Sequence, residues 1–254
     1  MDLAFVIIMG GLWGSFANVC IYRLPEQKSV VSGRSFCPNC KKKIVWYDNI
    51  PIISYFLLGA RCRNCKKKIS IKYLIVELIN TISFITIYYI FGISLTTIFL
   101  MSLSLSFLII FFIDLKHFII PNELTFTMMF VGFFKSFDPN LHFLFPNYLD
   151  SLIGGLFGYG VIWSIIIFYK QIRKKEGMGL GDAKLLAVIG FWFGWISIPF
   201  VLFFSSVLAL ISVTPDLIKK SKKFSSQIPF GPYLILASIL FFVSKDKLVN
   251  IIFI

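Results

Sequence analysis

The sequence predicts an all-α polytopic membrane protein, because its composition excludes an ordinary soluble domain. Of the 254 residues, 57% are hydrophobic, 15% are charged and 30 are phenylalanine. A soluble domain of this length needs more polar surface than that. The formal net charge of +13 would suggest nucleic-acid binding in a soluble protein. Here the basic residues stand in short loops, where they orient a chain in the bilayer, so we expect a lipid environment and no nucleic-acid partner.

Long apolar segments predict about eight membrane-spanning helices. They cover residues 3–22, 73–92, 95–113, 122–137, 151–169, 185–198, 199–217 and 231–244. The first segment has no basic region ahead of it and no small-residue cleavage site, so we expect a retained helix and not a signal peptide. The fourth segment contains Lys135, whose ammonium group is expected to snorkel to the membrane surface.

The large polar segment between the first two apolar segments sets the predicted orientation. Residues 23–72 hold twelve Lys and Arg residues against two acidic ones. The positive-inside rule places this loop in the cytoplasm and the N-terminus outside. The sequence therefore divides into a first transmembrane helix at 1–22, a cytoplasmic loop at 23–72 and a membrane domain at 73–254.

Alternation of the later segments supports the same orientation. The lysine-bearing stretches 170–184 and 218–230 become cytoplasmic, and residues 138–150, which contain no Lys or Arg, become external. Lys245 and Lys247 would then lie outside, against the positive-inside rule.

The cytoplasmic loop contains an internal repeat, CPNCKKKI at 37–44 and CRNCKKKI at 62–69. Two CxxC pairs at this separation are typical of a structural zinc site closed by four thiolates. The ligands would be Cys37, Cys40, Cys62 and Cys65. Neighbouring lysines would stabilise the thiolates. Two disulfides or free thiols are the alternative, and a reducing cytoplasm argues against disulfides.

Two aspartates stand at the ends of apolar segments, where a carboxylate is costly and indicates function. Asp114 ends the run SFLIIFFID, and Asp182 lies in GMGLGD at 177–182, just ahead of the sixth apolar segment. The predicted topology places both at cytoplasmic helix ends, at a similar depth. Two such carboxylates can activate a water and protonate a peptide carbonyl without a metal. For each aspartate alone, a helix cap is the alternative.

Three further residues near these segments carry expectations. Gly179 and Gly181 would let an extended substrate approach the aspartate, since they lack a Cβ atom. Glu77, near the cytoplasmic end of the second apolar segment, could pair with a loop lysine or serve a second site.

Seven motifs in order along nearly the whole chain resemble the bacterial prepilin leader peptidases, which are membrane aspartic proteases of the GxGD type. The motifs are GSFANVCIYRLP at 14–25, the CxxC pairs, WYDNIPIISY at 46–55, ISIKYLIVEL at 69–78, the segment from Asp114 to IPN, GMGLGDAKLL at 177–186 and PFGPYL at 229–234. The resemblance implies an enzyme of the bacterial inner membrane that cleaves the basic leader from type IV pilin-like precursors. It also implies methylation of the new N-terminal amine with S-adenosylmethionine.

The resemblance also assigns residues to the peptidase site. Asp114 and Asp182 match the family's catalytic aspartates, and the same motifs contribute active-site loop residues, namely Gly179, Gly181, Lys184, Pro121 and Asn122. Many relatives have aspartate at position 122, which favours a helix cap for Asn122. Relatives often carry Arg-Gly where this chain has Gly59-Ala60, in the half associated with methylation.

Several alternatives follow from these observations. The protein could be a peptidase without methyl transfer, since no G-x-G-x-x-G follows a predicted strand. An ion-coupled transporter could use the two aspartates as a relay, although it would favour carboxylates nearer the bilayer midplane. A membrane-anchored zinc adaptor would need only the 23–72 loop. The sequence does not determine the oligomeric state.

Overall fold

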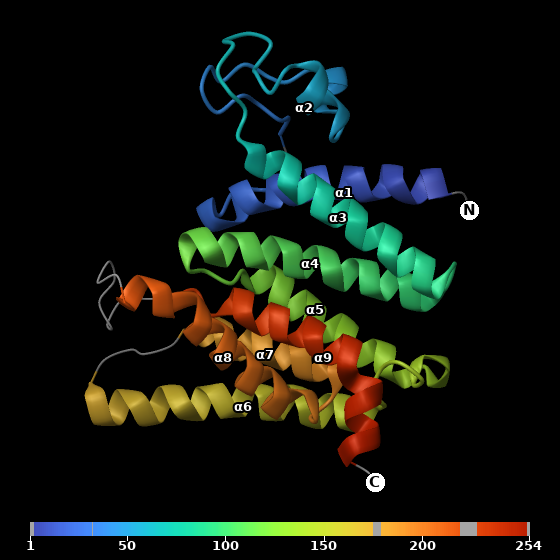
Figure 1. Ribbon diagram of the computed structural model, residues 1–254, viewed down its shortest axis with the longest axis vertical. Coiled ribbons are helices and arrows are strands. Elements are labelled where there is room, and N and C mark those ends of the chain that lie inside the picture. The colour runs from blue at the N-terminus through green and yellow to red at the C-terminus, as the bar shows by residue number, and fades with distance from the viewer. Residues whose placement is uncertain (1–2, 32, 175–178, 219–227, 253–254) are drawn as a thin grey trace. The chain divides into compact units, whose positions relative to one another are not determined.

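The computed structural model describes residues 3–31, 33–174, 179–218 and 228–252, and within these ranges the regular elements are helices apart from two isolated β-bridges (Figure 1). The predicted all-α fold is confirmed. Some basic residues of the predicted cytoplasmic loops lie outside the described residues, namely Lys175, Lys219, Lys220, Lys222 and Lys223, as do Gly177 and Met178 of the glycine-rich motif.

Each predicted apolar segment overlaps a helix, but the segment 185–198 extends past the end of one helix at Phe193 and into the start of the next at Ser197. The elements are α1 (Leu3–Arg23), η1 (Leu24–Glu26), η2 (Trp46–Asn49), α2 (Ile53–Leu57), α3 (Ile71–Phe91), α4 (Leu95–His117), α5 (Asn122–Phe134), η3 (Lys135–Phe137), η4 (Pro139–Leu141), α6 (Tyr148–Arg173), α7 (Leu180–Phe193), α8 (Ser197–Ile218) and α9 (Gly231–Ile252). In the described residues, five helices are long and apolar enough to cross a membrane: α1, α3, α4, α6 and α8. Because α5 and α7 have only 13 and 14 residues, the count of eight crossings stays a prediction.

The chain forms two compact units, Met1–Ile109 and Ile110–Ile254. In the first unit, α1 and α3 pack closely (Figure 1), because glycines of α1 face the backbone of α3. A Cβ atom on Gly10 would lie 2.8 Å from Cα of Thr81, and one on Gly14 would lie 2.8 Å from Cα of Glu77. The side chain of Asn80 also donates to the carbonyl of Gly10 at 2.8 Å. Small residues that let backbones approach are typical of helix pairs in membranes.

In the second unit, α7 is held between α5 and α6. A Cβ atom on Gly154 of α6 would lie 2.5 Å from the carbonyl oxygen of Gly190 in α7, so the two backbones are in direct contact. On the other side, the indole N–H of Trp192 donates to the carbonyl of Met128 in α5 at 2.8 Å. These contacts fix the position of α7, the helix that carries Asp182.

The expectation that Lys135 snorkels to the surface is wrong. This residue is 3% exposed, and its ammonium group lies 3.9 Å from the ring centroid of Phe145 and 5.0 Å from that of Trp192. It also donates to the carbonyl of Trp192 at 3.4 Å. Aromatic faces attract a cation, so burial beside two rings replaces exposure.

Candidate functional site

The four cysteines of the repeat come together in the first unit, as their spacing predicted. The Sγ atoms of Cys37, Cys40, Cys62 and Cys65 all lie within 4.8 Å of one another, and these residues are free thiols and not disulfides. The separation of Sγ in Cys37 from Sγ in Cys65 is 3.9 Å. Tetrahedral zinc with Zn–S bonds near 2.3 Å requires sulfurs about 3.8 Å apart, so the cluster fits that ion.

Each CxxC pair is built on the same backbone turn. In the first turn, N–H of Cys37 donates to the carbonyl of Lys42 and N–H of Lys41 donates to that of Cys37, both at 2.9 Å. Cys62 and Lys66 repeat the pattern, also at 2.9 Å. Lys41 and Lys66 have φ values of 58° and 57°, in the left-handed region. The sequence repeat is therefore a structural repeat that presents two thiols from each turn.

Polar groups around Cys65 favour the ionised form of its thiol. The side-chain N–H of Asn39, in the first turn, donates to Sγ of Cys65 in the second turn at 3.5 Å. Lys67 in turn donates to the side-chain oxygen of Asn39 at 2.8 Å. Hydrogen bonds from Asn39 and from the backbone of Lys67 lower the pKa of Cys65 to about 6. Because metal ligands must be thiolates, this environment suits a metal site.

Asp114 lies near the C-terminal end of α4 and is buried, with 4% of its surface exposed. Its Oδ2 accepts a hydrogen bond of 3.0 Å from the backbone N–H of Gly231, the first residue of α9. The N-terminus of a helix stabilises negative charge. Asp114 therefore contacts the start of a helix far along the chain, which the sequence alone did not reveal.

Asp182 lies in the first turn of α7, where Gly179 occupies the N-cap position. The backbone amide of Gly179 interacts with the Asp182 carboxylate, which corresponds to one half of a capping box. The capping alternative thus has structural support, and it is compatible with a chemical role. Asp182 is also within Coulombic range of Asp114.

Ile120 connects the surroundings of the two aspartates. A Cβ atom on Gly181, next to Asp182, would lie 3.1 Å from Cβ of Ile120. A Cβ atom on Gly231 would lie 3.3 Å from Cδ1 of the same Ile120 and 2.8 Å from Oδ2 of Asp114. Space for a Cβ atom is therefore lacking at Gly231 and tight at Gly181. Gly179 has a φ of −84° and its Cβ would meet Asp182 Oδ2 at an ordinary 3.8 Å, so the expectation for it finds no steric support.

Two more predicted site residues meet beside this centre. Nζ of Lys184 in α7 donates to the side-chain oxygen of Asn122 in α5 at 2.7 Å. The N-cap of α5 is Pro121 and no side chain caps the helix, so the capping interpretation of Asn122 is wrong. Its side chain instead links the IPN segment to the glycine-rich motif. Sequence reasoning missed the partnership of Gly231 and Ile120 with the aspartates, although PFGPYL marked the position of Gly231.

Comparisons with known proteins identify the family to which this chain is similar. Residues 8–91 match the family model described as the bacterial peptidase A24 N-terminal domain, and residues 101–214 match the type IV leader peptidase family. A prepilin leader peptidase/N-methyltransferase of Pseudomonas aeruginosa is 33% identical over 92% of this chain and 89% of its own length. The protein of that name from Vibrio cholerae is 33% identical over 96% of this chain and 98% of its own length. No solved structure matches the chain.

Proposed function

Because the chain belongs to the type IV leader peptidase family, we propose that Asp114 and Asp182 form the catalytic pair that removes the basic leader from type IV prepilin-like precursors. The reaction would take place at the cytoplasmic face of the bacterial inner membrane. The observation that carries this proposal is the neighbourhood around Ile120, where Gly181 lies beside one aspartate and Gly231 beside the other.

Two carboxylates suffice for peptide hydrolysis when one is ionised and the other protonated. The ionised carboxylate takes a proton from water as the water oxygen attacks the peptide carbonyl carbon. The protonated carboxylate gives its proton to the carbonyl oxygen, which leaves a neutral tetrahedral intermediate. Proton transfer to the amide nitrogen then allows the C–N bond to break, which releases an acid and an amine and restores the pair.

The surrounding residues have separate duties in this proposal. The Gly231 N–H, at 3.0 Å from Oδ2, orients the carboxylate of Asp114. Gly181 has no side chain, so a substrate peptide can approach the carboxylate of Asp182. Lys184 and Asn122 hold α7 to α5, so that Asp182 keeps its position relative to the IPN segment.

We assign a structural zinc ion to the four cysteines of the first unit. The donor set and the sulfur separations fit the ion, which would tie the two turns together. Four thiolates complete a tetrahedral shell, so the ion would have no open position for a water or a substrate. We therefore assign peptide cleavage to the carboxylates of Asp114 and Asp182 and not to the zinc ion.

The proposed second activity is methylation of the new N-terminal amine with S-adenosylmethionine. Relatives that match 92% and 96% of this chain carry the name N-methyltransferase. In this reaction the neutral amine nitrogen attacks the methyl carbon, the carbon–sulfur bond breaks and its electron pair stays on sulfur. The methylated nitrogen then loses its extra proton to water.

One experiment tests both activities. Purified protein is incubated with a pilin precursor, with and without S-adenosylmethionine, and the product masses are measured. We expect cleavage in both mixtures and a further gain of one methylene in mass only with the methyl donor. Absence of cleavage would contradict the peptidase proposal, and cleavage without the mass gain would leave a peptidase alone.

A further inference from the structure

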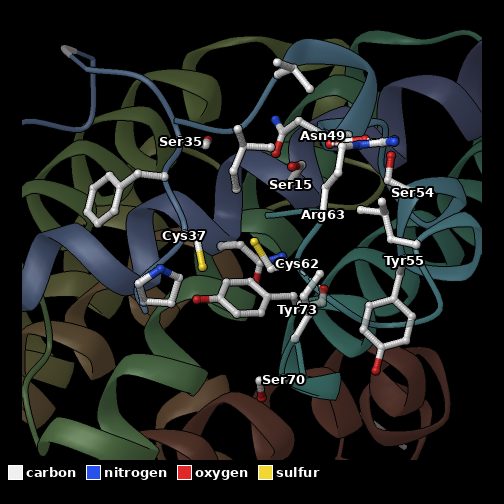
Figure 2. A pocket seen from close by; sticks show the side chains of 18 of the residues that line it. Ser15, Ser35, Cys37, Asn49, Ser54, Tyr55, Cys62, Arg63, Ser70 and Tyr73 are labelled. Atoms are coloured by element: carbon white, nitrogen blue, oxygen red, sulfur yellow. Dashed lines mark hydrogen bonds and ion pairs between the residues drawn. The ribbon is translucent and has the colours of Figure 1, made fainter. Parts of the chain in front are cut away.

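The first unit contains a cavity of about 610 Å³. Its walls come from α1, which contributes Ser15, from the cysteine loop, which contributes Cys37 and Cys62, and from α3, which contributes Tyr73 (Figure 2). This volume lies in the range of sites for small molecules and cofactors. The two aspartates proposed for cleavage belong to the second unit.

The carboxylate of Glu77 in α3 lines this cavity. Its Oε2 accepts a hydrogen bond of 2.7 Å from the backbone N–H of Ile52. In the described part of the chain, no cationic side chain lies within ion-pair distance of Glu77, so the predicted pairing with a loop lysine is not found. The side chains of Ser15 and Asn18 also lie within hydrogen-bonding range of this carboxylate. These neutral donors leave its negative charge unbalanced, and a cationic ligand would balance it.

Both arginines of the cavity lining have partners other than Glu77. Asp48, another acidic residue of the lining, is paired with Arg63 through two hydrogen bonds of 2.8 and 2.6 Å. Arg23, also in the lining, donates to the backbone carbonyls of Ser29 and Gly33 at 3.1 Å. These pairings leave Glu77 as the carboxylate of the cavity that can receive a positive ligand group.

The backbone that serves Glu77 is strained. Ile52 has a φ of 63° and a ψ of −54°, which is an outlier for a β-branched residue. Such a conformation costs on the order of 1–3 kcal/mol and occurs where the surroundings impose it, often at ligand sites. Here it points the N–H group at the Glu77 carboxylate, so that the acceptor is held in place before a ligand arrives.

We propose that this cavity binds S-adenosylmethionine, with Glu77 facing the positively charged sulfonium half of the molecule. This inference rests on the methyl-transfer part of the proposed function. Four tyrosines line the cavity, namely Tyr22, Tyr47, Tyr55 and Tyr73. Their faces suit both the flat adenine ring and a cation, while the lining lysines Lys42 and Lys43 suit the ligand's carboxylate.

The negative charge of Glu77 would make the site bind the methyl donor more tightly than the product. The donor carries a sulfonium cation, whereas the product S-adenosylhomocysteine has a neutral sulfur, because the bonding electron pair stays there after transfer. Opposite charges attract one another. Glu77 therefore favours the donor over the spent product, and its removal should reduce that preference.

Equilibrium binding to the full-length, zinc-loaded protein in detergent tests this assignment. Labelled S-adenosylmethionine and S-adenosylhomocysteine are titrated into the wild type, Glu77→Gln and the control Glu123→Gln, which makes the same change in α5 of the other unit. We expect Glu77→Gln to weaken binding of the donor by about tenfold and binding of the product by clearly less. The control should match the wild type. Equal affinity of Glu77→Gln and the wild type for the donor would overturn the assignment.

A photo-cross-link keeps the test independent of how the variant folds. The wild type is irradiated with an 8-azido derivative of S-adenosylmethionine, and the labelled peptide is identified. We expect label within residues 15–77, and label within 110–254 would overturn the proposal. If the wild type binds no donor and methylates nothing, the methyltransferase function itself fails. If it methylates but Glu77→Gln binds normally, only this site assignment fails.

Discussion

The backbone N–H of Gly231 donates a hydrogen bond of 3.0 Å to Oδ2 of Asp114, although 117 residues separate them in the sequence. The contact brings the first residue of α9 against the last turns of α4. It leaves no room for a side chain, because a Cβ atom at position 231 would lie 2.8 Å from the same oxygen. This relationship gives the most direct test of the proposed peptidase site.

Gly231→Ala should reduce cleavage by about 10- to 100-fold, since an error of 1 Å in a catalytic group can cost that much. Gly231 is not among the glycines with positive φ, so alanine would act through contact with Asp114 and not through backbone strain. Initial cleavage rates of a pilin precursor measure the effect. The control is Gly160→Ala in α6, where a Cβ atom meets nothing within 4 Å; equal rates for both variants would remove the positioning role.

Asp114→Asn, Asp182→Asn and the double variant should lose cleavage to a similar, nearly complete extent, because groups that act as a unit give non-additive losses. Asparagine keeps the size and the acceptor oxygen, so it can still receive the Gly231 N–H and still cap a helix. Chelators should leave the cleavage step active. Near-normal cleavage by either single variant would show that the aspartate only caps. Asp150→Asn, in the first turn of α6, is the matched control and should cleave normally.

Serine in place of Cys37, Cys40, Cys62 or Cys65 should lower zinc content from about one ion per chain and impair methylation at least as much as cleavage. The cysteines lie in a different unit from the aspartates, and Cys37 and Cys62 line the cavity of the first unit. Metal analysis and product masses check this expectation. Cys20→Ala, which changes a buried cysteine outside the cluster, should retain zinc. Full methylation by a metal-free variant would refute the expectation that the cysteine cluster supports methylation.

Lys184→Met and Asn122→Ala should each lower cleavage several-fold, and the double variant should be little worse than either. The two side chains share one hydrogen bond of 2.7 Å, and partners in one interaction show non-additive effects in a double-mutant cycle. The cycle compares the cleavage rates of the wild type, the two single variants and the double variant, each measured at a saturating concentration of precursor. Strictly multiplicative losses would mean that the two residues act separately.

Gly154→Ala should destabilise the second unit by about 1–3 kcal/mol, the usual cost of overpacking. A Cβ atom there would lie 2.5 Å from the carbonyl oxygen of Gly190, which is backbone and cannot turn aside as a side chain would. Thermal unfolding in detergent measures the loss. Gly160→Ala in the same helix serves as the reference and should unfold at or above the wild-type temperature.

The sequence allowed the helices and the cysteine cluster to be predicted because both have local signatures. Apolar runs mark helices of membrane proteins, and the repeat of CxxC at 37–40 and 62–65 marks a four-thiol cluster. The sequence motifs marked both Asn122 and Lys184 as site residues, but they did not predict the hydrogen bond between the two side chains. For Asn122 they suggested a helix cap, which was wrong.

The contacts that could not be predicted join residues with no fixed spacing. Lys135 is buried by Trp192, 57 residues away, and Glu77 takes its hydrogen bond from Ile52, 25 residues away. Neither pair leaves a pattern in composition or periodicity. A glycine followed by proline at the start of α9 was a visible signal for Gly231, but its partner Asp114 becomes evident only when α4 and α9 are packed.

The paired turns of the cysteine loop also determine which cellular conditions would keep the loop folded. Each turn supplies half of a four-thiolate shell, so an ion bound there would join two stretches of chain without any oxidation step. A disulfide would do the same where thiols are oxidised, but it would be reduced in the cytoplasm. An ion tie is opened by metal depletion or acid and not by reductants. The supply of zinc, and not the redox poise of the cell, would then decide whether the loop stays closed.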